Sequence, residues 1–270
     1  MSRVWFITGS SRGFGRRFAE AALSRGDRVA ATARSAGSLA PLAAEYGDAL
    51  LPIELDVTDR AAVGDAVARA HSAFGRLDIV VNNAGYGLFG AVEELSEQQI
   101  RDQFETNVFG ALWVTQAVLP FLREQRAGHI IQMSSIAGVI AVPNLGGYNA
   151  SKWALEGLSD SLAQEVAGHG IHVTLVEPAR FATDWSGPSA VHADPLPAYD
   201  SVREFARSRG TFSPGDPDAA GAALLRIVDA ETPPLRVFFG TTPGKVVPRV
   251  YAARLESWQE WAEVAELAQG

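Results

Sequence analysis

A doubly wound, open parallel β-sheet with helices on both faces is the α/β architecture that the sequence predicts. Seven short runs of apolar and β-branched residues recur along the 270-residue chain, at residues 4–8, 28–33, 50–55, 77–82, 129–134, 172–176 and 235–240. Segments with helical periodicity separate these runs, which implies parallel strands joined by right-handed crossovers. The runs are apolar almost throughout, as expected for strands buried on both faces. The length suggests one or two domains, and α/β sheets often reach about 250 residues as a single domain, so we expect one domain over residues 1–270.

The helices between these runs are predicted from apolar residues spaced three or four positions apart. This spacing begins at Phe18 after the first run and at Val63 after the third. A long helix is expected from about residue 96 to residue 126, because Ser96 is a favourable N-cap residue. A second long helix is expected over residues 148–168, since Gly170 follows it.

Two segments depart from this alternation. Residues 178–217 contain too many prolines for a regular element, and so long a segment in an α/β domain is typically a substrate lid. The alternative is a disordered surface insertion. Residues 246–268 return to helical spacing, with four large apolar residues, Trp258, Trp261, Val264 and Leu267. We expect one face of this tail to pack on the sheet or on another subunit.

The composition excludes several classes of protein. The chain has no cysteine, which removes disulfide scaffolds, thiolate metal sites and cysteine nucleophiles. It carries 23 basic and 31 acidic residues, and its net charge of −8 argues against binding to nucleic acid or to an anionic membrane. The five histidines show no metal-ligand spacing, so no metal is expected. Lacking a signal peptide or a membrane-spanning pattern, the chain is expected to be cytoplasmic.

A glycine-rich turn directly follows the first apolar run. Its residues are Gly9, Ser10, Ser11, Arg12, Gly13, Phe14 and Gly15, and helical spacing begins immediately after them. Glycines at these positions allow a tight turn and close approach of the backbone to a pyrophosphate. The phosphates would then lie at the N-terminus of the helix, where free N–H groups favour negative charge. The turn therefore predicts a dinucleotide site in a Rossmann-type fold.

Further motifs follow this turn in order along the chain. They are Asp56-Val57, Asn83-Ala84-Gly85, Asn107, Ser135, Tyr148-x3-Lys152, and a segment from Pro178 to Thr183. Together with the glycine turn they resemble the short-chain dehydrogenase/reductase family in its common single-domain form, over about residues 3–185. Residues 83–90 are similar to the branch that contains hydroxysteroid and retinol dehydrogenases. Members of the family commonly pair through two long helices, so the resemblance implies a homodimer or a homotetramer.

The resemblance assigns the proton-transfer chemistry to Tyr148 and Lys152. Four residues apart at the start of a helix, their side chains share one face. A tyrosine hydroxyl ordinarily has a pKa near 10, and a nearby ammonium group is expected to lower that pKa. The family role of Tyr148 is general acid in reduction and general base in oxidation, and Lys152 also holds the nicotinamide ribose.

Two polar residues complete the implied catalytic set. Ser135 lies thirteen residues before Tyr148, the family spacing, and would donate a hydrogen bond to the substrate carbonyl. Its neighbour Ser134 would point to the other face of the strand and be structural. Asn107 lies in the middle of a predicted helix, where asparagine is unfavourable. The resemblance implies that it bends the helix and holds a water in a proton relay, and the alternative is a hydrogen bond to a neighbouring residue.

The cofactor is expected to be NADP(H). The second strand ends at Ala33 and is followed by Arg34, where NAD-specific Rossmann units have an acid. With Arg12 it supplies two guanidinium groups that suit a 2′-phosphate. The alternative is that Arg34 is a solvated loop residue.

The remaining cofactor contacts are implied by the resemblance alone. Asp56 and Val57 correspond to adenine contacts, Asn83 to Gly85 to the wall of the adenosine ribose, and Pro178 and Thr183 to nicotinamide contacts. One departure from the family pattern is Ala179 in place of the usual glycine, which restricts the backbone beside the nicotinamide.

The sequence thus predicts an NADP(H)-dependent carbonyl reductase or secondary alcohol dehydrogenase. Its substrate would be a small hydrophobic ketone or alcohol, such as a steroid, retinoid, terpenoid or polyketide. The residues expected to line the substrate site are Ser135, Ile136, Val142, Leu145, Tyr148, Phe181 and Trp185. Core packing is the alternative for the apolar ones, especially Ile136 and Val142. The alternative function is a regulatory protein of the same fold that senses NADP(H) without turnover, although such a protein is expected to lack the tyrosine or the lysine.

Overall fold

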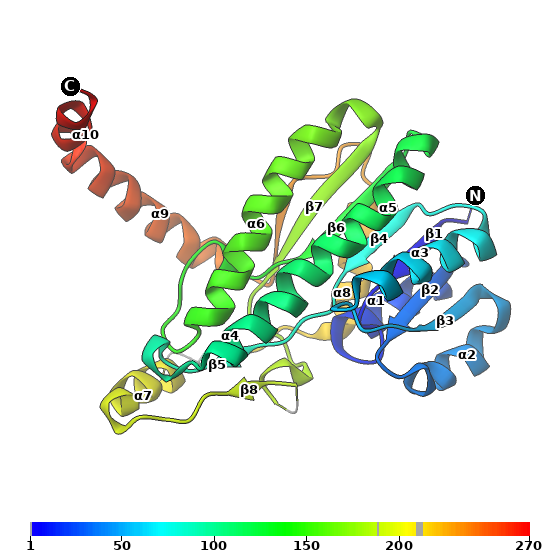
Figure 1. Cartoon of the computed structure of the whole chain (residues 1–270), viewed down its shortest axis with the longest axis horizontal. Coiled ribbons are helices and arrows are strands. Elements are labelled where there is room, and N and C mark those ends of the chain that lie inside the picture. The colour runs from blue at the N-terminus through cyan, green and yellow to red at the C-terminus, as the bar shows by residue number, and fades with distance from the viewer. Residues whose placement is uncertain (1, 188, 209–212) are drawn as a thin grey trace.

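Seven parallel strands form the central sheet of the protein, seen here in a computed structural model that describes residues 2–187, 189–208 and 213–270 (Figure 1). Their order across the sheet is β3-β2-β1-β4-β6-β7-β9. They are β1 (Val4–Ile7), β2 (Arg28–Ala33), β3 (Leu50–Glu54), β4 (Ile79–Asn82), β6 (Gly128–Met133), β7 (Ile171–Pro178) and β9 (Arg236–Phe239). The predicted seven-stranded, doubly wound sheet is confirmed, because each strand lies on one of the seven apolar runs.

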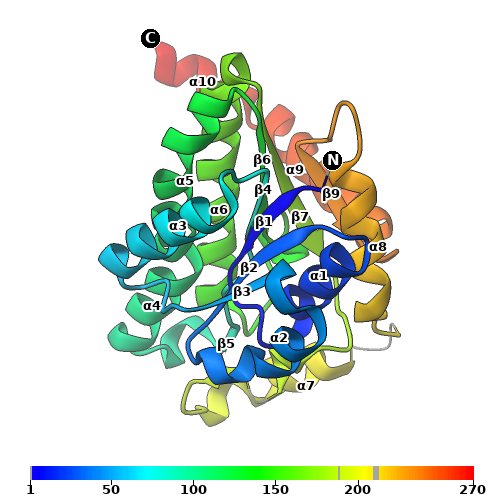
Figure 2. The ribbon, with the colours of Figure 1, turned by 90° about the vertical axis from the view of Figure 1, so that its right-hand side faces the viewer.

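Helices cover both faces of this sheet (Figure 2). On one face lie α1 (Gly13–Ser24), α2 (Ala40–Tyr46) and α8 (Pro217–Val228), and on the other α3 (Arg60–Phe74), α5 (Ala111–Gln125) and α6 (Gly146–Val166). Successive side chains of β1 point to opposite faces of the sheet, so this strand packs against both helical layers. Trp5 and Ile7 belong to the core under α1, whereas Val4 and Phe6 belong to the core under α3, and all four are fully buried. Two apolar cores therefore hold the sheet between its helical layers.

The direction of winding reverses between β1 and β4. Strand β1 is hydrogen-bonded to β2 on one side and to β4 on the other. The chain runs outward through β2 and β3, then returns to build β4, β6, β7 and β9 in the opposite direction. Loops that leave the carboxyl ends of adjacent strands diverge at such a reversal, which opens a crevice where α/β proteins bind ligands.

The expected long helix near residues 96–126 is present but interrupted. Ser96 caps its first part, α4 (Glu97–Phe104), by accepting a hydrogen bond from the backbone N–H of Gln99 at 3.2 Å. A π-helical turn over Glu105–Gly110 then joins α4 to α5. Turns of this wider kind are frequently found at functional sites.

The proposed lid segment, residues 178–217, contains more regular structure than its prolines predict, and its residues 188 and 209–212 lie outside the described ones. Strand β8 (Val191–His192) pairs in parallel with β5 (Leu88–Phe89), and α7 (Asp200–Ser208) follows. Strands of two residues are too short for any sequence periodicity, so both were missed. The segment is tied to the body where Tyr199 donates to Glu93 and Arg203 pairs with Glu94.

The C-terminal tail forms two helices that extend away from the rest of the molecule (Figure 1). They are α9 (Pro243–Glu260) and α10 (Ala262–Gln269). The helical prediction for residues 246–268 is confirmed, but packing of the tryptophan face on the sheet is not observed. Trp258 and Trp261 are 65% and 67% exposed. Within the described part of the chain, no helix has the length and apolarity needed to cross a bilayer.

Candidate active site

The glycine-rich turn connects β1 to α1 at the point where the winding reverses. Gly9 and Gly13 have φ values of +67° and +55°, a conformation that disfavours other residues. Gly15 meets a different restriction, because a Cβ atom there would lie 2.4 Å from both the side-chain amide of Asn83 and the carbonyl oxygen of Gly9. All three glycines are therefore required by the geometry of the turn itself.

Asn83 and Thr8 clamp the turn to the loop that follows β4. The Nδ2 atom of Asn83 donates to the carbonyl oxygens of Thr8 and Gly9, at 2.9 and 3.0 Å. In return the hydroxyl oxygen of Thr8 accepts from the backbone N–H groups of Asn83 and Ala84. Asn83 therefore fixes the two loops that border the crevice, in addition to the ribose contact expected of residues 83–85.

The N-terminus of α1 is free to receive an anion. Arg12 is the N-cap residue, and its side chain makes no capping hydrogen bond. A cavity of about 380 Å³ opens beside this helix end, and its lining includes Arg12, Gly13 and Thr183. Free N–H groups at a helix N-terminus favour phosphate binding, so the glycine turn and this cavity fit the pyrophosphate of a dinucleotide.

The two arginines expected to select NADP(H) are available to a ligand. Arg34 directly follows β2, and the turn is held near that strand because the N–H of Ser10 donates to the carbonyl oxygen of Thr32 at 2.8 Å. Both Arg12 and Arg34 are exposed, and within the described ranges neither belongs to an ion pair.

The expected adenine contacts, Asp56 and Val57, have different environments. The carboxylate of Asp56 is exposed and accepts hydrogen bonds from the N–H and hydroxyl groups of Thr58. Val57 is buried, and its side chain packs beneath Gly110, where an added Cβ atom would lie 2.7 Å away. The side chain of Val57 thus packs the core, which leaves its backbone as the part that a cofactor could contact.

Tyr148 and Ser135 lie together at the carboxyl edge of the sheet. Ser135 lies two residues after the end of β6, and Tyr148 lies in the first turn of α6. The Ser135 hydroxyl accepts a hydrogen bond from the backbone N–H of Ala137 at 3.1 Å. Burial raises the pKa of Tyr148 to about 12, and a hydrogen bond with Ser135 opposes this shift only in part. The tyrosine hydroxyl is therefore protonated at neutral pH.

Lys152 lies one helical turn beyond Tyr148, as the spacing predicts. Its ammonium group donates to the carbonyl oxygen of Met133 at 2.7 Å and lies 5.7 Å from the centre of the Tyr148 ring. Burial lowers the pKa of Lys152 to about 8, while the negative charge of Glu156 raises it. The expected lowering of the tyrosine pKa by this lysine is not observed. The ammonium is directed to a backbone carbonyl, and burial dominates both side chains.

Asn107 lies within the π-helical turn and is almost completely buried. Its Oδ1 atom accepts from the N–H of Tyr86 at 3.1 Å, and its Nδ2 atom donates to the carbonyl oxygen of Tyr86 and to the hydroxyl of Ser151. An added Cβ atom on Gly85 would lie 2.9 Å from Asn107 Oδ1 and 3.8 Å from Lys152 Nζ. The asparagine is thus brought beside the lysine, and it also makes the neighbour hydrogen bonds of the alternative interpretation.

A cluster of aromatic rings lies against Tyr148. The ring of Trp185 lies 4.9 Å from that of Tyr148 and 5.2 Å from that of Phe89, which in turn stacks on His192 at 5.1 Å. Trp185 was expected at the substrate site, whereas Phe89 and His192 were missed. The contact of Phe89 with His192 depends on the pairing of β5 with β8, for which the sequence carries no signal. An aromatic surface therefore adjoins the ring of Tyr148.

The other expected substrate residues divide between the site and the core. Phe181 packs edge-on against Phe14 at 5.0 Å, within the core under α1, and Ile136 packs with Val139 and Val247. We therefore assign Phe181 and Ile136 to packing. Val142 and Leu145 lie near the start of α6, and both make main-chain contacts there. The carbonyl oxygen of Val142 accepts from Asn149, and Leu145 bridges to Gly90.

The segment after β7 holds the departure from the family pattern. Pro178 ends β7, and the N–H of Ala179 donates to the carbonyl oxygen of Phe239 at 2.9 Å. The methyl group of Ala179 is directed toward Gly240, where an added Cβ atom would lie 3.5 Å from it. Thr183 is the N-cap of a short 3-10 helix and lines the cavity at α1. The alanine methyl group thus lies beside Gly240, the residue that follows β9, at an ordinary packing distance.

A buried acid beside the lysine was also missed. Glu156 lies four residues after Lys152, on the same face of α6, and its carboxylate accepts from Arg236 at 3.1 Å. Arg236 also lies 3.7 Å from Glu177, whose pKa is raised to about 8 by burial and by the charge of Glu156. The repeated four-residue spacing from Tyr148 through Lys152 to Glu156 is the sequence signal that could have revealed it. Across the described residues, no group of three His, Cys, Asp or Glu side chains is suited to a metal.

Comparison with known proteins identifies the class to which this fold and site belong. The family model described as short chain dehydrogenase matches residues 3–192. The chain therefore belongs to the short-chain dehydrogenase family, whose members are NAD(P)-dependent oxidoreductases, and it is an oxidoreductase enzyme.

Individual relatives match the chain over nearly its whole length. It is 42% identical to the oxidoreductase BOA17 of Botryotinia fuckeliana, over 96% of this chain and 98% of that protein. It is 35% identical to the 3-ketodihydrosphingosine reductase of Bacteroides thetaiotaomicron, over 95% of this chain and 93% of that protein. The crystal structure of a short-chain dehydrogenase from Streptomyces avermitilis superimposes with a TM-score of 0.93 at 38% identity, covering 98% of each chain.

Proposed function

We propose that this chain is an NADP(H)-dependent reductase of hydrophobic ketones, in which Tyr148 transfers the proton, and that it also oxidises the corresponding secondary alcohols. The observation that carries this proposal is the position of the buried Tyr148 hydroxyl. It lies at the carboxyl edge of the sheet, hydrogen-bonded to Ser135 and covered by Trp185. Open α/β sheets bind their ligands at this edge.

The roles of the side chains follow from their positions. A nicotinamide bound in the crevice would supply or accept the hydride. Ser135 would donate a hydrogen bond to the substrate oxygen and stabilise the charge that develops on it. Tyr148 would donate its proton to the same oxygen, and its pKa of about 12 keeps that proton in place at neutral pH. Lys152, buried beside Asn107 and Gly85, would hold a ribose hydroxyl.

The preference for NADP(H) is supported by Arg12 and Arg34. Both are exposed cations at the border of the crevice, without ion pairs to described residues, where an NAD-specific site would place an acid. An arginine binds a phosphate through a planar set of donors, so two of them suit a 2′-phosphate.

The substrate class is inferred from the aromatic surface beside Tyr148. Trp185, Phe89 and His192 form a continuous cluster of aromatic rings that favours an apolar or extended substrate. The name of the Bacteroides relative indicates a reductase of a long-chain ketone, and residues 83–90 resemble hydroxysteroid and retinol dehydrogenases. We favour an aliphatic lipid-like ketone for this chain. We also propose a cytoplasmic homo-oligomer with residues 178–217 as its substrate lid.

Loss of nicotinamide absorbance measures this activity directly. NADPH and then NADH would be offered with a panel of long-chain, cyclic and short polar ketones. Turnover with NADPH, fastest on the apolar ketones and abolished in Tyr148→Phe, is the expected result. NADPH that binds without being consumed on any ketone, or equal turnover by wild type and Tyr148→Phe, would overturn the proposal.

A further inference from the structure

The apolar face of α9 is buried where the helix leaves the body and exposed beyond that point. Val247 packs against Val139 and Ile140 and is 9% exposed. Continuing at helical spacing, Tyr251 is 38%, Leu255 57% and Trp258 65% exposed. Residues 247, 251, 255 and 258 lie on one stripe of an α-helix. Arg254 lies over the rings of Tyr251 and of Trp153 on α6, so the body still touches the helix at this level. The stripe therefore begins as core and becomes steadily more exposed toward Trp258.

The exposed area is large for a monomer. Seven large apolar residues of the tail are between 37% and 81% exposed: Val250, Tyr251, Leu255, Trp258, Trp261, Val264 and Leu267. A single large aromatic side chain buries about 150–250 Å² when covered, so the tail offers several hundred Å² of apolar surface. A stable protein interface buries about 800 Å² on each partner. The tail thus supplies most of what one side of a dimer needs.

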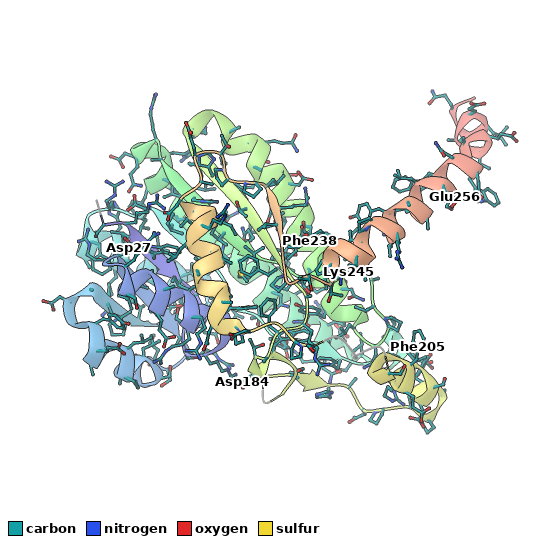
Figure 3. All side chains as sticks on the ribbon, turned by 180° about the vertical axis from the view of Figure 1, so that it is seen from behind. Asp27, Asp184, Phe205, Phe238, Lys245 and Glu256 are labelled. Carbon is teal, nitrogen blue, oxygen red and sulfur yellow. The ribbon has the colours of Figure 1, made fainter. Side chains whose placement is uncertain are left out.

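The charges of the tail are separated along its length. Its basic residues, Lys245, Arg249 and Arg254, all precede residue 255, and its acidic residues, Glu256, Glu260, Glu263 and Glu266, all follow it. Figure 3 shows Lys245 where α9 leaves the sheet and Glu256 far out along the tail. Two such tails attract each other when they run antiparallel, because the basic segment of each tail, nearest the body, then lies along the acidic end of the other. Parallel tails would place like charges together.

We infer that residues 243–269 form an arm that pairs antiparallel with the arm of a second copy of this chain. The twofold axis passes near Leu255, where the sign of the charge changes, and the stripe from Tyr251 to Trp258 forms the apolar centre of the contact. The same acidic end disfavours an anionic lipid surface as the partner. The arm is separate from the catalytic site, so this inference does not depend on the proposed function.

The mass of the full-length protein in solution tests the inference. We expect Leu255→Glu with Trp258→Glu to halve the mass measured by light scattering, because each arm then places two carboxylates at the apolar centre. Val92→Glu is the matched control, since Val92 is 76% exposed on the body of the molecule and its variant keeps the wild-type mass. An unchanged far-ultraviolet circular dichroism spectrum shows that the variants are folded. Equal masses for the arm variant and the wild type would overturn the inference.

A disulfide tests the antiparallel geometry. The chain has no cysteine, so a single introduced one reports only on its own position. We expect Leu255→Cys to form a covalent dimer under mild oxidation, because residue 255 meets itself at the twofold axis. Ala253→Cys lies on nearly the opposite side of the helix and should remain monomeric on a non-reducing gel. Failure of Leu255→Cys to cross-link, cross-linking of both variants to the same extent, or capture of the wild-type protein by neutral lipid vesicles would each contradict the inference.

Discussion

We expect two exposed arginines, Arg12 and Arg34, to determine the preference for NADPH over NADH. Changing them should therefore alter cofactor selectivity without altering proton transfer. Changing Arg12 and Arg34 to serine, singly and together, removes the cations at the border of the crevice but leaves the glycine turn intact. The turn is held by Asn83 and Thr8, and neither arginine contributes to those hydrogen bonds. We therefore expect weaker binding of NADPH, with NADH affected little.

The magnitude follows from the exposure of these side chains. A hydrogen bond to a charged group contributes about 1.5–3 kcal/mol. Solvent screening at exposed positions reduces this to about 1 kcal/mol for each arginine, or about fivefold in kcat/KM. Each single variant should thus lower the NADPH-to-NADH ratio of kcat/KM about fivefold, and the double variant up to about 25-fold.

Initial rates on one ketone, with each cofactor varied, measure that ratio. Arg123→Ser provides the control, because Arg123 is an exposed arginine at the end of α5, far from the turn in sequence and on the other helical layer. Its ratio should equal that of the wild type. A wild-type enzyme that prefers NADH, or a double variant with an unchanged ratio, would refute the assignment of Arg12 and Arg34 while leaving the proton-transfer residues untouched.

Three further substitutions test the turn, the lysine and the aromatic cover. Gly15→Ala should destabilise the protein by about 1–3 kcal/mol in thermal unfolding, because the new methyl group would lie 2.4 Å from a backbone oxygen. Gly64→Ala, at an exposed position of α3, should stabilise the protein by about 0.5–1 kcal/mol. Equal effects of the two substitutions would contradict the steric argument. Glu156→Gln removes the charge that raises the pKa of Lys152, so that pKa falls further below its present value of about 8. Lys152 then loses its proton at a lower pH, and the alkaline limb of the rate profile for ketone reduction should move to lower pH, while an unmoved limb would show that the carboxylate is only structural. Trp185→Ala should raise KM for apolar ketones about fivefold to tenfold, with less effect on short polar ones, and a uniform change over both groups would argue against a substrate contact.

Local pattern was sufficient to predict the sheet and most of the site. Apolar runs marked the seven strands, because the inner strands are buried on both faces and must be largely apolar, although the edge strand β9 is partly exposed. The spacing of Gly9, Gly13 and Gly15 marked the turn, since it reflects backbone conformation that the sequence encodes directly. Tyr148 and Lys152 were placed on one face by the period of the helix alone.

Long-range contacts are what local pattern did not predict. The stacking of Phe89 on His192 depends on the pairing of β5 with β8, about a hundred residues apart, and two-residue strands carry no period. The pKa of Tyr148 also departs from the expected direction, because it is decided by burial and not by the neighbouring ammonium.

The sequence by itself determined the class of fold, the glycine turn and the order of the catalytic residues, because each of these depends on spacing within one or two adjacent elements. Only the tertiary structure decided which aromatic rings cover the tyrosine and that the apolar stripe of α9 leaves the body exposed. Helical periodicity specifies that a face is apolar and must be covered. It does not specify the surface that covers it, since that choice depends on the direction in which the helix leaves the sheet.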